Sequence, residues 1–145
     1  MNSSASIVWF RQDLRLHDNE ALTDALSSGS TVVPVYVFDE RTFGTKTKRF
    51  GFEKTGAHRL KFIIESVADL RNSLRDRGTD LIVRVGKPEK VVTQIARDLR
   101  TGYVFCNRER TQEEVEVQDA LEKNLWSIGQ ELRVVRCKML LHAAD

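Results

Sequence analysis

The chain has 145 residues, a length that fits one domain and leaves no room for a second of ordinary size. With 41% hydrophobic and 30% charged residues its composition is that of a globular protein, which excludes a disordered, collagen-like or coiled-coil chain. The net charge of +2 is too balanced to predict a nucleic-acid-binding protein by itself.

Short apolar runs and helical patterns alternate from the beginning of the chain. Residues 6–10 predict a buried strand that contains the first of the two tryptophans. Asp18 or Asn19 can cap the helix that follows, and Gly29 stands where that helix ends. The β-branched and aromatic run 31–38 predicts the strongest strand.

The middle of the chain continues with a long loop and a long helix. Pro34 places a bulge or an edge-facing position in the preceding strand. Residues 39–55 predict a polar loop of a length that is usually functional or an interface. A helix begins at Gly56 and ends at Gly78, which is a suitable residue after a helix C-terminus. Its apolar face is formed by Leu60, Ile63, Ile64, Val67, Leu70 and Leu74.

The remaining elements repeat the alternation. Residues 81–85 and 103–106 predict two further strands, separated by a helix that starts with a proline at its first position. Residues 111–114 (T-Q-E-E) form a capping box that opens the last helix, and residues 132–135 predict the last strand. We expect an α/β fold, with a five-stranded parallel, doubly wound (Rossmann-like) sheet of order 3-2-1-4-5 and helices on both faces. Trp9 and Trp126 are both expected to be packed inside this fold.

Several classes of protein find no support in the sequence. No apolar stretch is long enough for a membrane span, and the polar start resembles neither a signal peptide nor a transit peptide. Cys106 and Cys137 are too few for a disulfide scaffold and fit a reducing compartment. No cysteine or histidine pair has the spacing of metal ligands, so we expect no metal. These features predict a soluble intracellular protein and leave its compartment open.

A ligand site is expected where the strand order reverses, between the first and fourth strands of the sheet. The segments that meet there are residues 10–13 (F-R-Q-D) and 106–110 (C-N-R-E-R), which are unusually polar for loops beside a buried sheet edge. The charged residues around Arg11 either form a salt-bridged loop that shapes the first turn or recognise a ligand or a neighbouring domain. The planar fork of arginine suits both interpretations.

Glu109 is the most informative residue of this edge. A carboxylate here can accept two parallel hydrogen bonds from a planar N–H/NH₂ edge, such as that of a pterin, of guanine or of arginine. On spacing alone, a pair with Arg108, Arg110 or Arg11 is the simpler expectation.

A series of motifs resembles one protein family. Residues 8–19 read V-W-F-R-Q-D-L-R-L-H-D-N and are followed by V-P-V-Y-V-F-D (33–39), G-F-E-K-T-G-A-H-R (51–59) and V-R-V-G-K-P-E (83–89). In this order and combination they resemble the DNA photolyase/cryptochrome family, with the greatest similarity to its cryptochrome-DASH and plant-type photolyase branch.

The resemblance implies that residues 1–145 form the N-terminal α/β antenna domain of such a protein. It implies methenyltetrahydrofolate, or another pterin or flavin, as a possible antenna, with its pterin ring on Glu109. Asn107, Arg108, Phe10 and Arg11 are the other candidate cofactor-binding residues, and no catalytic residue is expected here. FAD, damaged DNA and light-driven lyase chemistry would belong to a helical domain that follows in the family.

The resemblance also implies a partner for this domain. The helical domain would contact Lys54 and Arg59, and damaged DNA would be reached only through that domain. The family's W-G-(S/N)-T segment is replaced by Arg-Cys-Lys-Met at residues 136–139. The alternative is therefore a standalone module that binds a partner or regulates without a chromophore.

Overall fold

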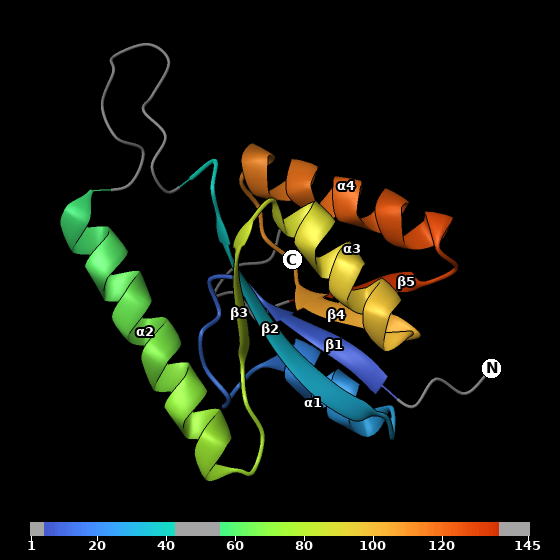
Figure 1. Ribbon diagram of the computed structural model, residues 1–145, viewed down its shortest axis with the longest axis horizontal. Coiled ribbons are helices and arrows are strands. Elements are labelled where there is room, and N and C mark those ends of the chain that lie inside the picture. The colour runs from blue at the N-terminus through green and yellow to red at the C-terminus, as the bar shows by residue number, and fades with distance from the viewer. Residues whose placement is uncertain (1–4, 43–55, 137–145) are drawn as a thin grey trace, which may run out of the picture.

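The computed structural model describes residues 5–42 and 56–136, in which strands and helices alternate (Figure 1). The strands are β1 (Ala5–Phe10), β2 (Thr31–Asp39), β3 (Ile82–Gly86), β4 (Tyr103–Asn107) and β5 (Glu131–Val135). The helices are α1 (Glu20–Ser27), α2 (Ala57–Asp76), α3 (Pro88–Leu99) and α4 (Gln112–Ser127). The strands pair in parallel in the order β3-β2-β1-β4-β5, which confirms the predicted fold class and topology. Lys54, Cys137 and the altered segment from residue 137 onward lie outside the described residues.

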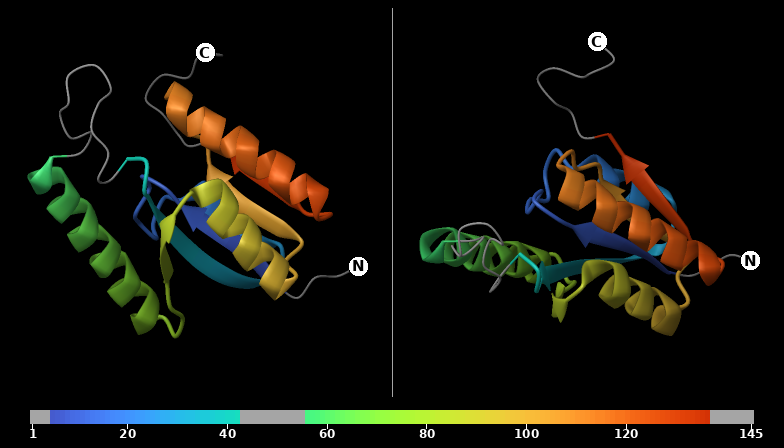
Figure 2. Two further views of the ribbon diagram at one scale, coloured as in Figure 1. Left: turned by 45° about the horizontal axis from the view of Figure 1, so that its top comes forward. Right: turned by 90° about the horizontal axis from the view of Figure 1, so that it is seen from above.

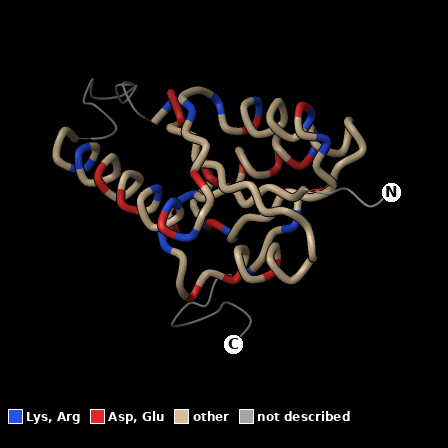
Figure 3. Tube along the Cα trace, turned by 60° about the horizontal axis from the view of Figure 1, so that its bottom comes forward, with Lys and Arg blue, Asp and Glu red and all other residues tan. Residues whose placement is uncertain are grey.

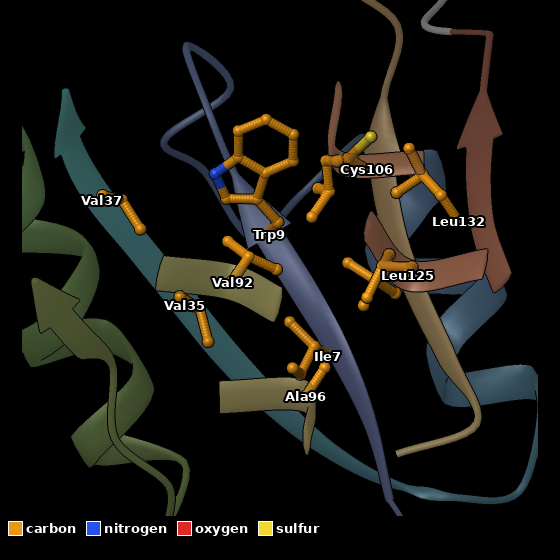
Figure 4. Close-up of a cluster of buried hydrophobic side chains, with 11 residues drawn as sticks. Ile7, Trp9, Val35, Val37, Val92, Ala96, Cys106, Leu125 and Leu132 are labelled. Carbon is orange, nitrogen blue, oxygen red and sulfur yellow. The ribbon is translucent and has the colours of Figure 1, made fainter. Parts of the chain in front are cut away.

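The sheet has an apolar core on each face because successive side chains of its strands point to opposite sides. Ile7 and Trp9 of β1 pack with side chains of α3 and α4, whereas Val8 and Phe10 pack with side chains of α1 and α2. Figure 4 shows the first of these clusters, and Figure 2 shows α3 and α4 side by side over their face. Two covered faces are the arrangement expected of a doubly wound parallel sheet.

Pro34 occupies an edge-facing position without a bulge. Residues 31–36 of β2 match residues 5–10 of β1 one to one. On the other side of β2, pairing with β3 begins only at Val35. Pro34 therefore lies in the stretch of β2 that pairs with β1 alone, where a missing N–H disturbs no second ladder.

The predicted helix ends are confirmed. The side chains of Asn19 and Thr111 each accept a hydrogen bond from the backbone N–H three residues later, at 3.2 and 3.4 Å. Pro88 is the first residue of α3, and Gly78 follows α2 with a φ of +85°. Caps of this kind satisfy backbone groups that have no partner within the helix, so the helices begin and end where the local sequence provides one.

Trp126 was predicted to be packed, and this is wrong: its side chain is 77% exposed, whereas Trp9 is buried as predicted. The buried face of α4 passes through Leu121 and Leu125. The residue after Leu125 is turned about 100° round the helix and points away from that face.

Helix α2 is buried over only part of its predicted apolar face. Val67, Leu70 and Leu74 in its C-terminal half are buried, but Ile64 is half exposed. Phe62, which is not part of the predicted face, is 68% exposed. Figures 1 and 2 show α2 beside the β3 edge of the sheet, so its N-terminal half is less covered. No helix in the described residues is long and apolar enough to cross a membrane. Positive and negative residues are interspersed along the described chain (Figure 3).

Candidate functional site

A pocket lies at the predicted place, where the carboxyl ends of β1 and β4 meet. Its volume is about 340 Å³. It is formed by the loop after β1, the loop after β4 and the beginning of α4. The lining residues are Gln12, Asp13, Arg15, Asn107, Arg108, Glu109, Arg110, Thr111 and Glu114. The strand order therefore brings together segments about a hundred positions apart in the chain, as the switch-point rule predicts.

A buried polar network forms one side of the pocket. The side-chain amide of Asn107 donates to a carboxylate oxygen of Asp13 at 2.5 Å and to Oδ1 of Asn19 at 2.9 Å. Its own oxygen accepts the backbone N–H of Ala21 at 3.1 Å. Asn107 is only 2% exposed, so these bonds satisfy a side chain that would otherwise be costly to bury. The network ties the end of β4 to the first turn of α1.

Asp13 is the acceptor at the centre of this network. Its carboxylate also accepts the backbone N–H of Arg11 at 2.8 Å and the side-chain amide of Asn19 at 3.1 Å. Asn19 in turn caps α1. The loop after β1 is thus held from both of its sides, which gives the pocket a preformed wall.

Arg11 is not among the residues that line the pocket, but its side chain fixes the loop after β1 to α4. One guanidinium nitrogen donates to the backbone carbonyl of Glu114 at 2.8 Å and another to Oε1 of Gln118 at 3.3 Å. The guanidinium carbon lies 4.4 Å from the centre of the Trp9 ring, in the position of a cation–π contact. These contacts clamp the loop after β1 onto α4.

Glu109 is half-buried in the pocket. Burial raises the pKa of its carboxyl group above the usual value, and the negative charges of Glu114 and Asp13 act in the same direction. The positive charge of Arg11 and the backbone N–H of Gln12 lower this pKa and so offset part of the rise.

The arginines near Glu109 do not neutralise it directly. Within the described residues, no ion pair joins Glu109 to Arg11, Arg108 or Arg110. The simpler expectation from spacing, an arginine pair, is therefore not what the structure shows. A carboxylate in this position retains acceptor capacity for a ligand.

Gln12 and Glu114 complete the lining of the pocket. The side-chain amide of Gln12 donates to Oε1 of Glu114. The backbone N–H of Glu114 is held by Thr111, as a capping box predicts, but its carboxylate reaches across to the loop after β1. The sequence placed Gln12 within one of the segments expected at this edge, without a role of its own, but did not assign Glu114 to the pocket. The signal was present, because a helix that begins just after the β4 loop must begin at the same sheet edge.

The remaining predicted site residues lie in different surroundings. Arg108 is exposed and lines the pocket, and its backbone N–H donates to the carbonyl of Val135 at 2.8 Å. Phe10 is fully buried in the core between the sheet and the helices α1 and α2. Arg59 is exposed on the first turn of α2, and its predicted neighbour Lys54 lies outside the described residues.

The described residues offer neither a metal site nor a reactive thiol. No group of three or more His, Cys, Asp or Glu side chains could hold a metal ion within residues 5–42 and 56–136. Cys106 is buried beside the pocket, and burial raises the pKa of its thiol to about 12. A thiol with such a pKa is a poor nucleophile at neutral pH.

Comparison with known proteins relates the whole chain to one family. A family model described as DNA photolyase matches residues 6–145. Blue-light photoreceptor PHR2 of Arabidopsis thaliana is 42% identical over 141 residues, and a cryptochrome DASH of Gloeobacter violaceus is 43% identical over 145 residues. These matches cover 97% and 100% of this chain but only 31% and 29% of the relatives.

Solved structures show the same relationship. A cryptochrome of Synechocystis superposes with a TM-score of 0.88 and 41% identity, over 94% of this chain and 28% of that one. A photolyase of Sulfolobus tokodaii, described with two FAD molecules and a novel light-harvesting cofactor, has a TM-score of 0.81 and 28% identity, over 91% of this chain and 29% of that one. The chain spans less than a third of the length of these relatives. Its sequence and fold show that it belongs to the DNA photolyase and cryptochrome family.

Proposed function

We propose that the pocket between the ends of β1 and β4 binds the pterin ring of an antenna chromophore, methenyltetrahydrofolate or a related molecule. The supporting observation is Glu109, a half-buried carboxylate that lines the pocket and has no arginine partner in the described residues. An ionised carboxylate accepts the paired N–H donors on the edge of a pterin through two parallel hydrogen bonds.

The surroundings of Glu109 fit this chemistry. A volume of about 340 Å³ is at the small end of ligand pockets, so it suits a fused ring system with the rest of the molecule outside. The backbone N–H of Gln12 lowers the pKa of the Glu109 carboxyl, which favours its ionised form. The network around Asn107 and Asp13 holds the pocket wall in place without using the acceptors of Glu109.

In this proposal the chain is the N-terminal antenna domain of a blue-light-dependent DNA photolyase or cryptochrome. When bound, the antenna absorbs near-UV or blue light and passes the excitation to FAD. The protein's task here is to hold the ring at a fixed position and orientation. FAD, pyrimidine-dimer repair or photoreception, and contact with damaged DNA are proposed for the helical domain of the longer protein.

The proposed contact with that helical domain is the N-terminal half of α2 with Lys54 and Arg59. Arg59 is exposed and lies three residues before Phe62, which places both side chains on neighbouring positions of the helix surface. An exposed aromatic side chain beside a cation is a typical composition for a protein contact.

Replacement of Glu109 by glutamine tests the antenna site. The variant Glu109→Gln keeps the size of the side chain but places an NH₂ group opposite the N–H donors of the pterin. We expect roughly 10- to 100-fold weaker binding of 5,10-methenyltetrahydrofolate, the equivalent of about one hydrogen bond to a charged group. The measurement is an absorbance titration of the purified chain.

A matched control is Glu116→Gln on α4. Glu116 is exposed, accepts a hydrogen bond from Gln112 at 3.1 Å and does not line the pocket. Its replacement should leave binding unchanged. Equal affinities of the wild type and Glu109→Gln would reject Glu109 as the pterin ligand. No binding of any pterin or flavin by the wild type would favour the chromophore-free module instead.

A further inference from the structure

The charged residues that line the pocket lie at different depths. Asp13 is buried, and Glu109 and Glu114 are partly buried. Arg108 and Arg110 stand on either side of Glu109 in the chain and are exposed, although they line the same pocket. Exposed residues of a pocket lining lie where the pocket opens to solvent. The pocket therefore has its carboxylates inside and two arginines, called here the mouth arginines, at its opening.

The mouth arginines keep their donors for a partner from solution. Within residues 5–42 and 56–136, no ion pair joins Arg108 or Arg110 to a carboxylate. The backbone N–H of Arg108 donates to the carbonyl of Val135 at 2.8 Å, which fixes the loop after β4 to the end of β5. Two guanidinium groups on an anchored backbone are well suited to bind carboxylates, because their planar forks match the two oxygens of that group.

Arg15 adds a third positive charge to the same pocket, from the loop after β1. One nitrogen of its guanidinium donates to the backbone carbonyl of Asp18 at 3.3 Å, so the side chain is held along its own loop. Three cations from two loops thus border one pocket. A cleft bordered by charge of one sign raises the local concentration of ligands with the opposite charge.

The chemistry of a pterin determines which end of the ligand reaches this opening. The donors proposed to bind Glu109 lie on the pyrimidinone edge of the fused rings, whereas the aminobenzoyl-glutamate tail of a folate leaves from the other ring. A donor edge on Glu109 therefore directs the tail away from that carboxylate. A pocket of about 340 Å³ holds the rings and leaves the tail outside, where the lining is exposed.

We propose that Arg108 and Arg110 form a second subsite of this pocket, which binds the carboxylates of a folate's glutamate or oligoglutamate tail, with Arg15 adding to the positive field. This inference rests on the proposed pterin site and deepens it. The carboxylate of Glu109 recognises the ring by its N–H donors, and the mouth arginines recognise the tail by its negative charge. The pocket is thus matched to a ligand with a donor edge at one end and anions at the other.

The expected effect of each arginine is modest. An ion pair between exposed groups contributes little free energy, because water and salt screen it. We expect each mouth arginine to strengthen binding of a tailed ligand by roughly two- to fivefold at low salt. A tail with more carboxylates gains more, since each additional glutamate adds one negative charge.

The experiment compares two ligands that share a ring and differ in the tail. They are 5,10-methenyltetrahydrofolate with one glutamate and the same molecule with three, each titrated into the purified chain by absorbance. The ratio of their dissociation constants is the tail gain. For the wild type we expect a tail gain of roughly three- to tenfold at low salt and a much smaller one in about 0.5 M NaCl. In the double variant Arg108→Gln/Arg110→Gln the tail gain should fall close to one.

Two further variants separate the tail from the ring and from overall charge. Arg97→Gln removes one positive charge from the exposed last turn of α3, outside the pocket lining, and should keep the tail gain of the wild type. Glu109→Gln should weaken both ligands by the same factor and so leave the tail gain unchanged. Circular dichroism checks that each variant is folded, which we expect because the replaced arginines are exposed.

The outcomes distinguish this inference from the function on which it rests. Equal affinity of the wild type for the two ligands would overturn the tail subsite and leave the pterin site standing. A tail gain that survives in the double variant, or that falls as far in Arg97→Gln, would also overturn it, because the gain would then come from elsewhere on the surface. If the wild type binds neither ligand, the proposed function fails and the tail subsite fails with it.

Discussion

Replacement of Asn107 by alanine should destabilise the fold far more than loss of a typical surface asparagine. The side chain makes three hydrogen bonds, to Asp13, to Asn19 and from the backbone N–H of Ala21, at 2.5, 2.9 and 3.1 Å. All of them lie in the network between β4 and α1, where Asn107 is 2% exposed and Asp13 is 6% exposed. Water cannot easily replace the lost partners at such a site.

The expected cost follows from the groups left behind. A buried polar group without a partner costs about 1–3 kcal/mol, and the bond to the Asp13 carboxylate is at the upper end of that range. Asp13 keeps the donors of Arg11 and Asn19, so part of its stabilisation remains. We therefore expect Asn107→Ala to lower the free energy of unfolding by about 3–5 kcal/mol, a large part of the roughly 5–15 kcal/mol typical of a domain.

Urea unfolding followed by circular dichroism measures this free energy. The matched control is Asn124→Ala, because Asn124 is only partly buried and makes one bond, to the backbone carbonyl of Glu89 at 3.0 Å. The control should cost about 1 kcal/mol. If the two variants lose the same stability, the buried network is not what holds β4 to α1.

Three further predictions concern single residues of the fold. Gly86 has a φ of +156° and an added Cβ would lie 2.9 Å from a side-chain methyl of α3, so Gly86→Ala should cost more than about 1 kcal/mol in urea unfolding. Gly56→Ala has open space and a negative φ, so it should lose only the smaller preference of a helix N-cap for glycine over alanine, and equal losses in the two variants would contradict this. Acrylamide should quench the fluorescence of the exposed Trp126 and spare that of the buried Trp9, so Trp126→Phe should remove most of the quenchable fluorescence. Strong quenching in that variant would show that Trp9 is accessible. Burial raises the pKa of the Cys106 thiol to about 12. In a Cys137→Ser variant at about pH 8, the folded chain should therefore react with a thiol reagent roughly a thousandfold more slowly than the unfolded chain. Similar rates would disprove the burial of Cys106.

The sequence alone determined the elements and their order. Strands and helices have different periods of apolar residues, and the caps Asn19 and Thr111 and the stop Gly78 act within one helical turn. Their βα alternation restricts the topology to a parallel, doubly wound sheet, and that topology already places Glu109 at the site edge. Local signals were therefore sufficient for the fold and for the position of the pocket.

Only the tertiary structure decided how the pocket is built. Arg11 bonds to Gln118, 107 positions later, and Gln12 to Glu114, 102 positions later, and neither pairing has a local signature. Trp126 illustrates the same limit, since one residue along a helix separates the buried Leu125 from an exposed side chain. Hydrogen-bond partners, burial and the pKa of a carboxyl depend on distances between segments remote in the chain, and these distances exist only once the sheet has assembled.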